Sequence, residues 1–212
     1  MVWIIPQQKY RQTKYACYDG SQKEHFCKPD ENWGAFTAQE CERVISLSKQ
    51  IKPSKPIVDG KVNPEIRQVN AWGVSYSEST RWLWERLVNS VKYANSKWWN
   101  YDIYGIIDYL QLLCYEASNN QKQKSIQDHY NKHIDNGELY YYRKISISVQ
   151  LSDPQDYEGS ELKLYTRREA ENLPKARGTM ILFPSFVLHE VTPIIKGKRW
   201  ALVCWVCGPQ FR

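Results

Sequence analysis

The chain has 212 residues, 42% apolar and 25% charged, which is enough to bury the core of one globular domain. Its 29 basic and 23 acidic residues give a net charge of +6. Because no block of about five to eight Lys and Arg residues occurs, we expect no nucleic-acid interface. No stretch approaches the roughly 20 apolar residues that a membrane-spanning helix needs.

The six cysteines are too sparse for a disulfide scaffold, and we expect mostly reduced thiols in a cytoplasmic protein. Cys17 and Cys27 could pair, and the sequence leaves this open. The spacing of Cys204 and Cys207 could suggest a redox pair. A strand would place these two sulfurs on opposite faces, and no helix N-terminus is available to activate a thiol, so we reject that reading.

Two helices are predicted in the N-terminal half, after an irregular polar arm over residues 1–34. Residues 36–48 have a helical pattern, with Thr37 at the N-cap and Glu40 placed to complete a capping box. A second helix is expected over residues 80–96. Its apolar side chains recur at helical spacing at Trp82, Leu83, Leu87 and Val91.

From residue 66 onward the sequence favours short strands. Residues 66–76 and 104–115 have strand-like patterns, and residues 144–150 alternate strictly between apolar and polar side chains. Further strands are expected at residues 162–165, 179–183, 190–195 and 200–207. Helices followed by many short antiparallel strands predict an α+β fold with a jelly-roll barrel of two sheets.

The chain is predicted to form a single domain over residues 1–212, because neither an internal repeat nor a second domain is recognisable. Residues 117–131 form a polar stretch between two strand-like segments. This composition indicates an exposed loop that could act as a lid.

Two histidines and one aspartate have the spacing of a metal site. Side chains two residues apart in a strand project from the same face, so His133 and Asp135 would converge on one point. His189 is expected on a later strand. Two histidines and one carboxylate form the facial triad that binds iron(II) and leaves coordination positions open. A His-x-Asp tripeptide is common by chance, and the alternative is an exposed loop histidine beside an acid.

A different metal pair is conceivable, because His129 and His133 would share one face of a helix. Asn131 and Gly137 lie in polar surroundings that disfavour a helix there. No Glu follows His129, so the His-Glu-x-x-His pattern of metalloproteases is absent.

Arg199 follows His189 at a spacing that strengthens the metal interpretation. We predict that Lys196 and Gly197 turn a hairpin, which would place Arg199 roughly 16 Å from His189 at ~3.3 Å per residue. A five-carbon diacid chelated to the metal would span that gap, and arginine is suited to a bidentate grip on its far carboxylate. Alternation predicts one shared face for Arg199, Ala201, Val203 and Trp205. The alternative is a surface arginine after a turn.

About half of the chain, residues 108–208, resembles the prolyl 4-hydroxylase-like 2-oxoglutarate oxygenases, including those carried by phages. The resemblance rests on the order and spacing of short segments. They are LLCYE at 112–116, HID at 133–135, VQLS at 149–152, YEGSEL at 157–162, FPS at 183–185, HEVTP at 189–193 and GKRWAL at 197–202. It implies a double-stranded β-helix, a cupin-like barrel with supporting N-terminal helices.

The resemblance also implies roles for individual residues. The iron ligands would be His133, Asp135 and His189. Arg199 would hold the distal carboxylate of 2-oxoglutarate, and Tyr115 matches a tyrosine that also bonds this cosubstrate. Gln150 occupies a position that is often tyrosine, so its contact with the cosubstrate departs from the family pattern.

On the substrate side, Tyr130 matches a tyrosine near the substrate proline, and Arg143 matches an arginine that contacts the substrate peptide. Trp205 matches a tryptophan that lines the substrate pocket. Tyr115 and Trp205 could equally be core aromatics. Strict alternation places Arg143 and Gln150 on opposite faces of a strand, so at most one points inward unless a bulge intervenes. Arg67 and Trp72 are further candidates for the substrate groove.

The implied reaction couples decarboxylation of 2-oxoglutarate, giving succinate and CO2, to hydroxylation of a C–H bond. By resemblance, the substrate is a prolyl residue of a peptide or protein, hydroxylated at its 4-position. Fe(II), 2-oxoglutarate and O2 would be required, together with ascorbate. The expected partner is thus a proline-containing peptide or protein, not a membrane or nucleic acid, in the cytoplasm of a host cell if the protein is phage-encoded.

Two alternatives stay open. An oxygenase of the same fold could act on a nucleic acid or a small molecule, and the polar residues between Tyr115 and Tyr130, longer than the usual family link, could alter substrate choice. The nucleic-acid demethylases carry further Arg and Asn after the cosubstrate arginine, whereas residues 200–205 read WALVCW here. A non-catalytic peptide-binding barrel is the second alternative, and the triad together with Arg199 argues against it.

Overall fold

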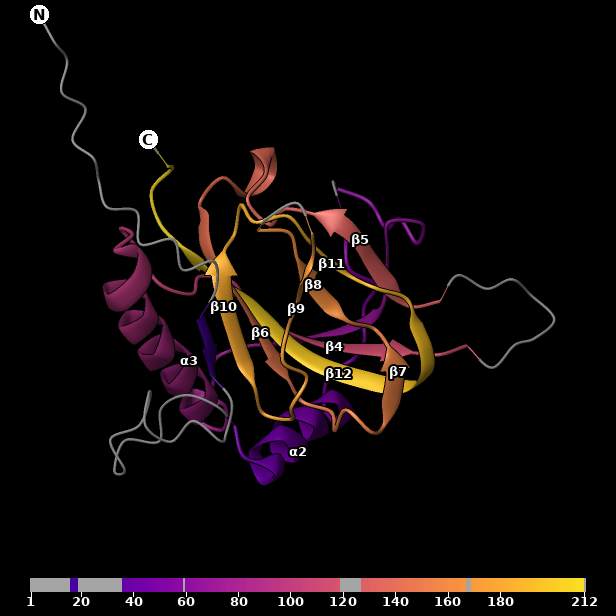
Figure 1. The fold of residues 1–212 in the computed structure, drawn as a ribbon. Helices are drawn as coiled ribbons and strands as arrows, with labels where there is room; N and C mark the ends of the chain where they lie inside the picture. Colours follow the sequence, from indigo (N-terminus) through magenta and orange to yellow (C-terminus); the bar gives the residue numbers. More distant parts are fainter. Residues whose placement is uncertain (1–15, 19–35, 59, 119–126, 167–168, 212) are drawn as a thin grey trace, which may run out of the picture.

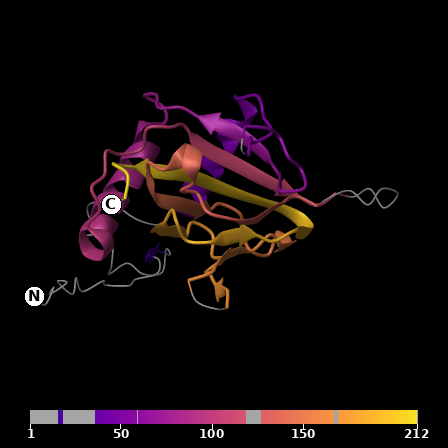
Figure 2. The ribbon, with the colours of Figure 1, turned by 90° about the horizontal axis from the view of Figure 1, so that it is seen from above.

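The computed structural model describes residues 16–18, 36–58, 60–118, 127–166 and 169–211. Two antiparallel sheets form the body of the protein (Figures 1 and 2). The larger sheet contains, in spatial order, β1 (Ala16–Tyr18), β10 (Met180–Pro184), β6 (Arg143–Gln150), β12 (Ile194–Cys207), β4 (Leu110–Glu116) and β3 (Asn70–Val74), and β7 (Tyr157–Gly159) pairs with β12. The smaller sheet contains β2 (Arg67–Gln68), β5 (His129–His133), β11 (His189–Val191), β8 (Leu162–Leu164) and β9 (Glu171–Asn172).

Two α-helices, α2 (Ala38–Ser46) and α3 (Arg81–Ala94), lie at the periphery of the barrel (Figure 1). The capping box predicted for the first helix is confirmed, because the Thr37 side chain accepts from the Glu40 backbone and the Glu40 carboxylate accepts from the Thr37 N–H. A 3-10 turn (Leu47–Lys49) extends α2, and a π-helical turn (Asn95–Trp99) extends α3. A further 3-10 turn (Glu138–Tyr140) follows β5.

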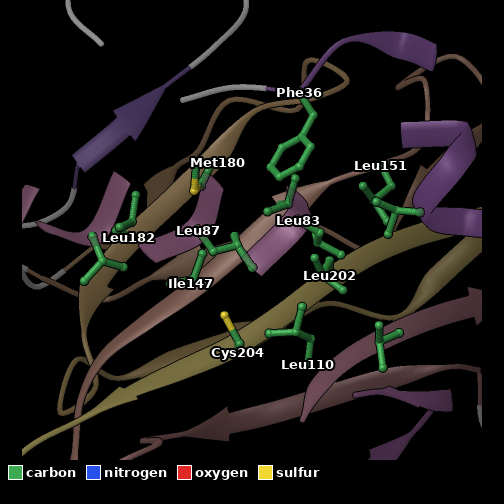
Figure 3. Close-up of a cluster of buried hydrophobic side chains, with 14 of the residues drawn as sticks. Phe36, Leu83, Leu87, Leu110, Ile147, Leu151, Met180, Leu182, Leu202 and Cys204 are labelled. Carbon is green, nitrogen blue, oxygen red and sulfur yellow. The ribbon is translucent and has the colours of Figure 1, made fainter. Parts of the chain in front are cut away.

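The outer face of the larger sheet packs against these helices in an apolar core (Figure 3). Leu83 and Leu87 of α3 lie in this cluster with side chains from five strands. These strand side chains include Leu110, Leu112, Ile145, Ile147, Val149, Met180, Leu182, Leu202, Cys204 and Val206. The intervening residues of the same strands therefore face the other sheet. This arrangement confirms the predicted α+β fold with a double-stranded β-helix.

The predicted hairpin at Lys196 and Gly197 is wrong, because both residues lie inside the continuous strand β12. Both edges of β11 are already paired, with β5 and with β8, so β12 has no edge of β11 to join. Gly197 has φ +75° and pairs with Tyr157 just after a register shift in β12. A Cβ there would lie 2.0 Å from the Asp156 carbonyl oxygen, so glycine is required by close packing rather than by a turn.

Other boundaries also differ from the sequence predictions. Part of the supposedly irregular arm forms β1, which pairs with β10, and the rest of residues 1–34 lies outside the described residues, as does Cys27. Residues 129–131 belong to β5 rather than to a loop, and residues 119–126 of the predicted lid lie outside the described residues. Within the described ranges, no helix is both long and apolar enough to cross a membrane.

Candidate metal centre and active site

His133, Asp135 and His189 converge in the smaller sheet, with ligand atoms all within 4.8 Å of one another. His133 ends β5 and His189 begins β11, and the two residues are paired directly across these strands. The Nε2 atom of His133 lies 3.6 Å from Asp135 Oδ1, and that of His189 lies 3.4 Å from Asp135 Oδ2. Two imidazoles and one carboxylate in this arrangement suit a non-haem iron(II) ion.

Asp135 does not lie on the strand that was predicted to carry it, because β5 ends at His133. Its backbone N–H donates to the Ser185 carbonyl at 2.9 Å. Its Oδ2 accepts from Ser146 Oγ at 2.6 Å, and Ser146 Oγ lies 3.0 Å from Ser185 Oγ. These hydrogen bonds, and not strand alternation, direct the carboxylate toward the two histidines.

Backbone carbonyls orient both histidine rings. Nδ1 of His133 lies 2.7 Å from the Asn131 carbonyl, and Nδ1 of His189 lies 2.8 Å from the Val187 carbonyl. Because a carbonyl oxygen only accepts, each Nδ1 carries the hydrogen. Each Nε2 lone pair is then free to bind a metal, the arrangement common in metal-ligating histidines.

The protonation states fit metal binding. Burial raises the pKa of Asp135, but the neighbouring His189 and His133 outweigh it and hold that pKa well below its usual range. Burial lowers the pKa of His133, despite the opposing effect of Asp135. A charged carboxylate and a neutral imidazole are the forms that ligate metal ions.

His129, the partner in the alternative metal pair, is occupied elsewhere. It lies on a strand and not on a helix. Its Nδ1 lies 2.7 Å from the Gln127 carbonyl, and its Nε2 lies 3.1 Å from the Glu65 carbonyl. Both ring nitrogens are therefore engaged with the backbone, so the structure gives His129 a structural role.

A cavity between the two sheets, which we call the metal cavity, contains the three ligands in its wall. The alternation predicted for β12 is confirmed, because four of its residues line this cavity: Arg199, Ala201, Val203 and Trp205. Tyr115 of β4 and Tyr130 of β5 also line it. Burial raises the pKa of Tyr115, so its hydroxyl stays protonated and can donate a hydrogen bond.

Arg199 is a buried cation with only 2% of its surface exposed. Its Nε and Nη2 donate to Gln150 Oε1 at 3.1 and 2.8 Å. Its Nη1 has no hydrogen-bond partner in the part of the chain that the structure describes. Burying a guanidinium without a carboxylate partner costs free energy of folding, and an anionic ligand would offset that cost. The cavity thus fits both a metal ion and a diacid.

Arg143 and Gln150 both face the interior. Strict alternation would place them on opposite faces of β6, and a bulge in the strand breaks that alternation. The register of β6 against β12 shifts between Val206 and Cys207, and Cys207 pairs with Arg143. The Arg143 guanidinium lies 3.7 Å over the Trp205 ring and 3.9 Å over the Tyr140 ring. Tyr130 and Trp205 thus line the metal cavity, and Arg143, which does not line it, stacks on Trp205.

Ser146 and Ser148 also line the metal cavity, although they were not among the candidate site residues predicted from the sequence. The signal was present in the alternation of serine with apolar residues along residues 144–150. Arg67 of β2 lines the same cavity, with its guanidinium 4.6 Å from the Tyr130 ring centre and its Nη2 donating to Gln111. Trp72, the other groove candidate, instead packs against the helix-side core.

Sequence comparison finds a superfamily match in the C-terminal half of the chain. Residues 110–207 match the family model of the 2OG-Fe(II) oxygenase superfamily. A PKHD-type hydroxylase from Hyphomonas neptunium is 36% identical over 84 residues, which cover 37% of this chain and 38% of that protein. Another from Prochlorococcus marinus is 38% identical over 79 residues, covering 37% and 36%. The chain thus matches less than two fifths of the length of these curated relatives.

Solved structures extend the likeness over most of the fold. A prolyl hydroxylase from Trichoplax adhaerens, in complex with a hypoxia-inducible-factor peptide fragment, aligns with a TM-score of 0.71 at 19% identity, covering 93% of this chain and 85% of that one. The viral collagen prolyl hydroxylase of Paramecium Bursaria Chlorella virus-1, in complex with 2-oxoglutarate, aligns with a TM-score of 0.64 at 14% identity, covering 95% and 99%. Residues 110–207 thus match the 2OG-Fe(II) oxygenase superfamily model, and the chain shares the fold of solved prolyl hydroxylases.

Proposed function

We propose that the protein is an Fe(II)- and 2-oxoglutarate-dependent dioxygenase that hydroxylates a prolyl residue of a peptide or protein at its 4-position. The observation that carries this proposal is a single cavity lined both by the His133, Asp135 and His189 triad and by the partly unpartnered Arg199. When bound, iron and 2-oxoglutarate supply the oxidising chemistry, with O2 consumed and succinate and CO2 released.

The residues of the chain hold and orient these groups. The triad presents two imidazole nitrogens and one carboxylate oxygen to the metal, and Ser146 fixes the carboxylate. Arg199 grips the distal carboxylate, oriented by its two hydrogen bonds to Gln150. Leu113, Leu162 and Val191 give the cavity apolar walls, which exclude bulk water from the reacting centre.

The surroundings of Arg143 favour a peptide as the substrate. It is held between the rings of Trp205 and Tyr140, and its buried Nε has no partner among the described residues. A fixed guanidinium with a free N–H can donate to a peptide carbonyl. The Trichoplax relative in complex with a peptide fragment favours the same substrate class. Dependence on ascorbate stays a prediction of the family resemblance, and a cytoplasmic location stays a prediction from the cysteine content.

The test uses purified protein with Fe(II), 2-oxoglutarate and a panel of proline-containing peptides, each matched to a peptide with alanine in place of proline. We expect a mass gain of one oxygen on the proline peptides alone, and 4-hydroxyproline after hydrolysis. Succinate formation without oxygen gain on any proline peptide would retain the oxygenase and exclude the prolyl substrate. No succinate under any condition would contradict the oxygenase itself.

A further inference from the structure

A second cavity lies next to the metal cavity and shares Arg199 and Leu162 with it as a common wall. We call it the side cavity. Gln150, Ser160, Lys163 and Lys175 also line it. Since Arg199 borders both cavities, a ligand gripped by its guanidinium can contact the residues of either one.

Ser160 is the unusual residue of the side cavity. It is fully buried, and its Oγ has no hydrogen-bond partner among the described residues. Its backbone has φ +49°, in the left-handed region that is unfavourable for residues other than glycine. Buried hydroxyls without partners are rare, and strained backbone of this kind clusters at functional sites. Serine at this position therefore needs a compensating contact that the described residues do not supply.

The charges around Ser160 favour an anion. The side cavity is lined by three cations, Arg199, Lys163 and Lys175, and by one acid, Glu161, which pairs with Lys175. Among the described residues that line the side cavity, Arg199 contributes the second buried donor without a partner, its Nη1. The side-chain oxygen Oε1 of Gln150 already accepts hydrogen bonds from Arg199. Because it is an acceptor, it cannot bind a carboxylate.

We propose that Ser160 Oγ and Arg199 Nη1 bind the same carboxylate, so that Ser160 is a second anchor for the distal carboxylate of 2-oxoglutarate. The inference rests on the proposed function, because it names a cosubstrate contact in the same site. It assigns the hydroxyl to a ligand that satisfies both orphan donors at once. It also explains why a strained serine occupies a position that glycine would fill without strain.

The experiment measures binding and not turnover. Protein loaded with Mn(II) is titrated without O2, by calorimetry, with 2-oxoglutarate and with 2-oxopentanoate, which has the same chain length but lacks the distal carboxylate. Ser160→Ala should weaken 2-oxoglutarate binding about tenfold, the usual effect of losing a hydrogen bond to a charged group. Binding of 2-oxopentanoate should be unchanged.

Two further variants separate the effect of the lost hydroxyl on affinity from effects of backbone strain and of protein stability. Ser160→Gly removes both the hydroxyl and the left-handed strain, so it should raise the melting temperature by several degrees while losing the same 2-oxoglutarate affinity as Ser160→Ala. Thr179→Val is the matched control, because Thr179 also has a buried hydroxyl without a partner in the described structure but lines neither cavity. It should leave 2-oxoglutarate affinity unchanged.

The outcomes distinguish this inference from the proposed function. Full 2-oxoglutarate affinity in Ser160→Ala or Ser160→Gly overturns the role of Ser160 alone. An equal loss for 2-oxopentanoate also overturns it, because the hydroxyl would then not act on the distal carboxylate. Failure of the unmodified protein to bind 2-oxoglutarate at all would instead contradict the proposed function.

Discussion

The two faces of β6 carry different side chains although both are buried, whereas neighbouring strands also place apolar residues such as Leu113 and Ile181 on the inner face of the sheet. On β6, Ile145, Ile147 and Val149 pack in the apolar core beneath the helices. Between them, Ser146 and Ser148 line the metal cavity. A sheet that packed only against helices and a second sheet would place apolar side chains on both faces. Polar side chains on the inner face mark a surface shaped for a ligand.

Within a single strand, some side chains therefore contribute mainly to stability and others mainly to ligand binding. Side chains of the outer face contribute to folding by burying apolar area. Those of the inner face keep polar groups buried for a ligand, at a cost to stability. Substitutions of the polar residues on the inner face should therefore reduce activity with little loss of stability, and substitutions of apolar residues on the outer face should do the reverse.

The largest effect is expected from His133→Ala on the inner side. Loss of one of three protein ligands should abolish iron-dependent succinate formation, while circular dichroism and the melting temperature stay close to those of the unmodified protein. His129→Gln is the control on the same strand, because His129 bonds only backbone carbonyls. It should lower the melting temperature and retain turnover. Normal turnover in His133→Ala would exclude the proposed metal centre.

Arg199→Gln should raise the KM for 2-oxoglutarate about 100-fold, because a charge-assisted bidentate contact to a carboxylate is lost. The melting temperature should change little, since removing a buried charge without an acidic partner offsets the lost hydrogen bonds to Gln150. Arg199→Lys should lose less affinity than the glutamine variant. A KM for 2-oxoglutarate that stays unchanged in Arg199→Gln would separate Arg199 from the cosubstrate.

Leu87→Ala tests the outer face. Leu87 is fully buried between α3 and the sheet, and such truncations lower the free energy of unfolding by about 2–5 kcal/mol. Urea denaturation would measure this loss. The kcat per folded molecule at low temperature should be unchanged. A lower kcat in the folded protein would indicate that the two faces are coupled.

The sequence predicted the fold class from local alternation, and it predicted the triad from the spacing of His133, Asp135 and His189 together with the family resemblance. Residues 144–150 alternate, and this alternation correctly indicated β6. Which of its faces points inward was not predictable, since the usual rule places apolar side chains inside and here they face the helices.

The errors concern long-range pairing. Whether β11 pairs with β12 depends on which edges of β11 are already occupied, and no local pattern records that. Asp135 is aimed by Ser146 and Ser185, far from it in sequence. Ser160 carried no signal at all, because its strain and its missing partner exist only in the folded chain.

The smallest effect is expected from Arg143→Gln, which should raise the KM for a proline peptide about tenfold, the effect of one charge-assisted hydrogen bond. The KM for 2-oxoglutarate should not change, because Arg143 lies over Trp205 and Tyr140 and not beside Arg199. Arg143→Lys should recover little of the loss, since lysine cannot stack in the same planar geometry. A rise in both KM values would mean that Arg143 shapes the whole inner face rather than the substrate side, because the bulge that turns Arg143 inward also sets the register of β6 against β12.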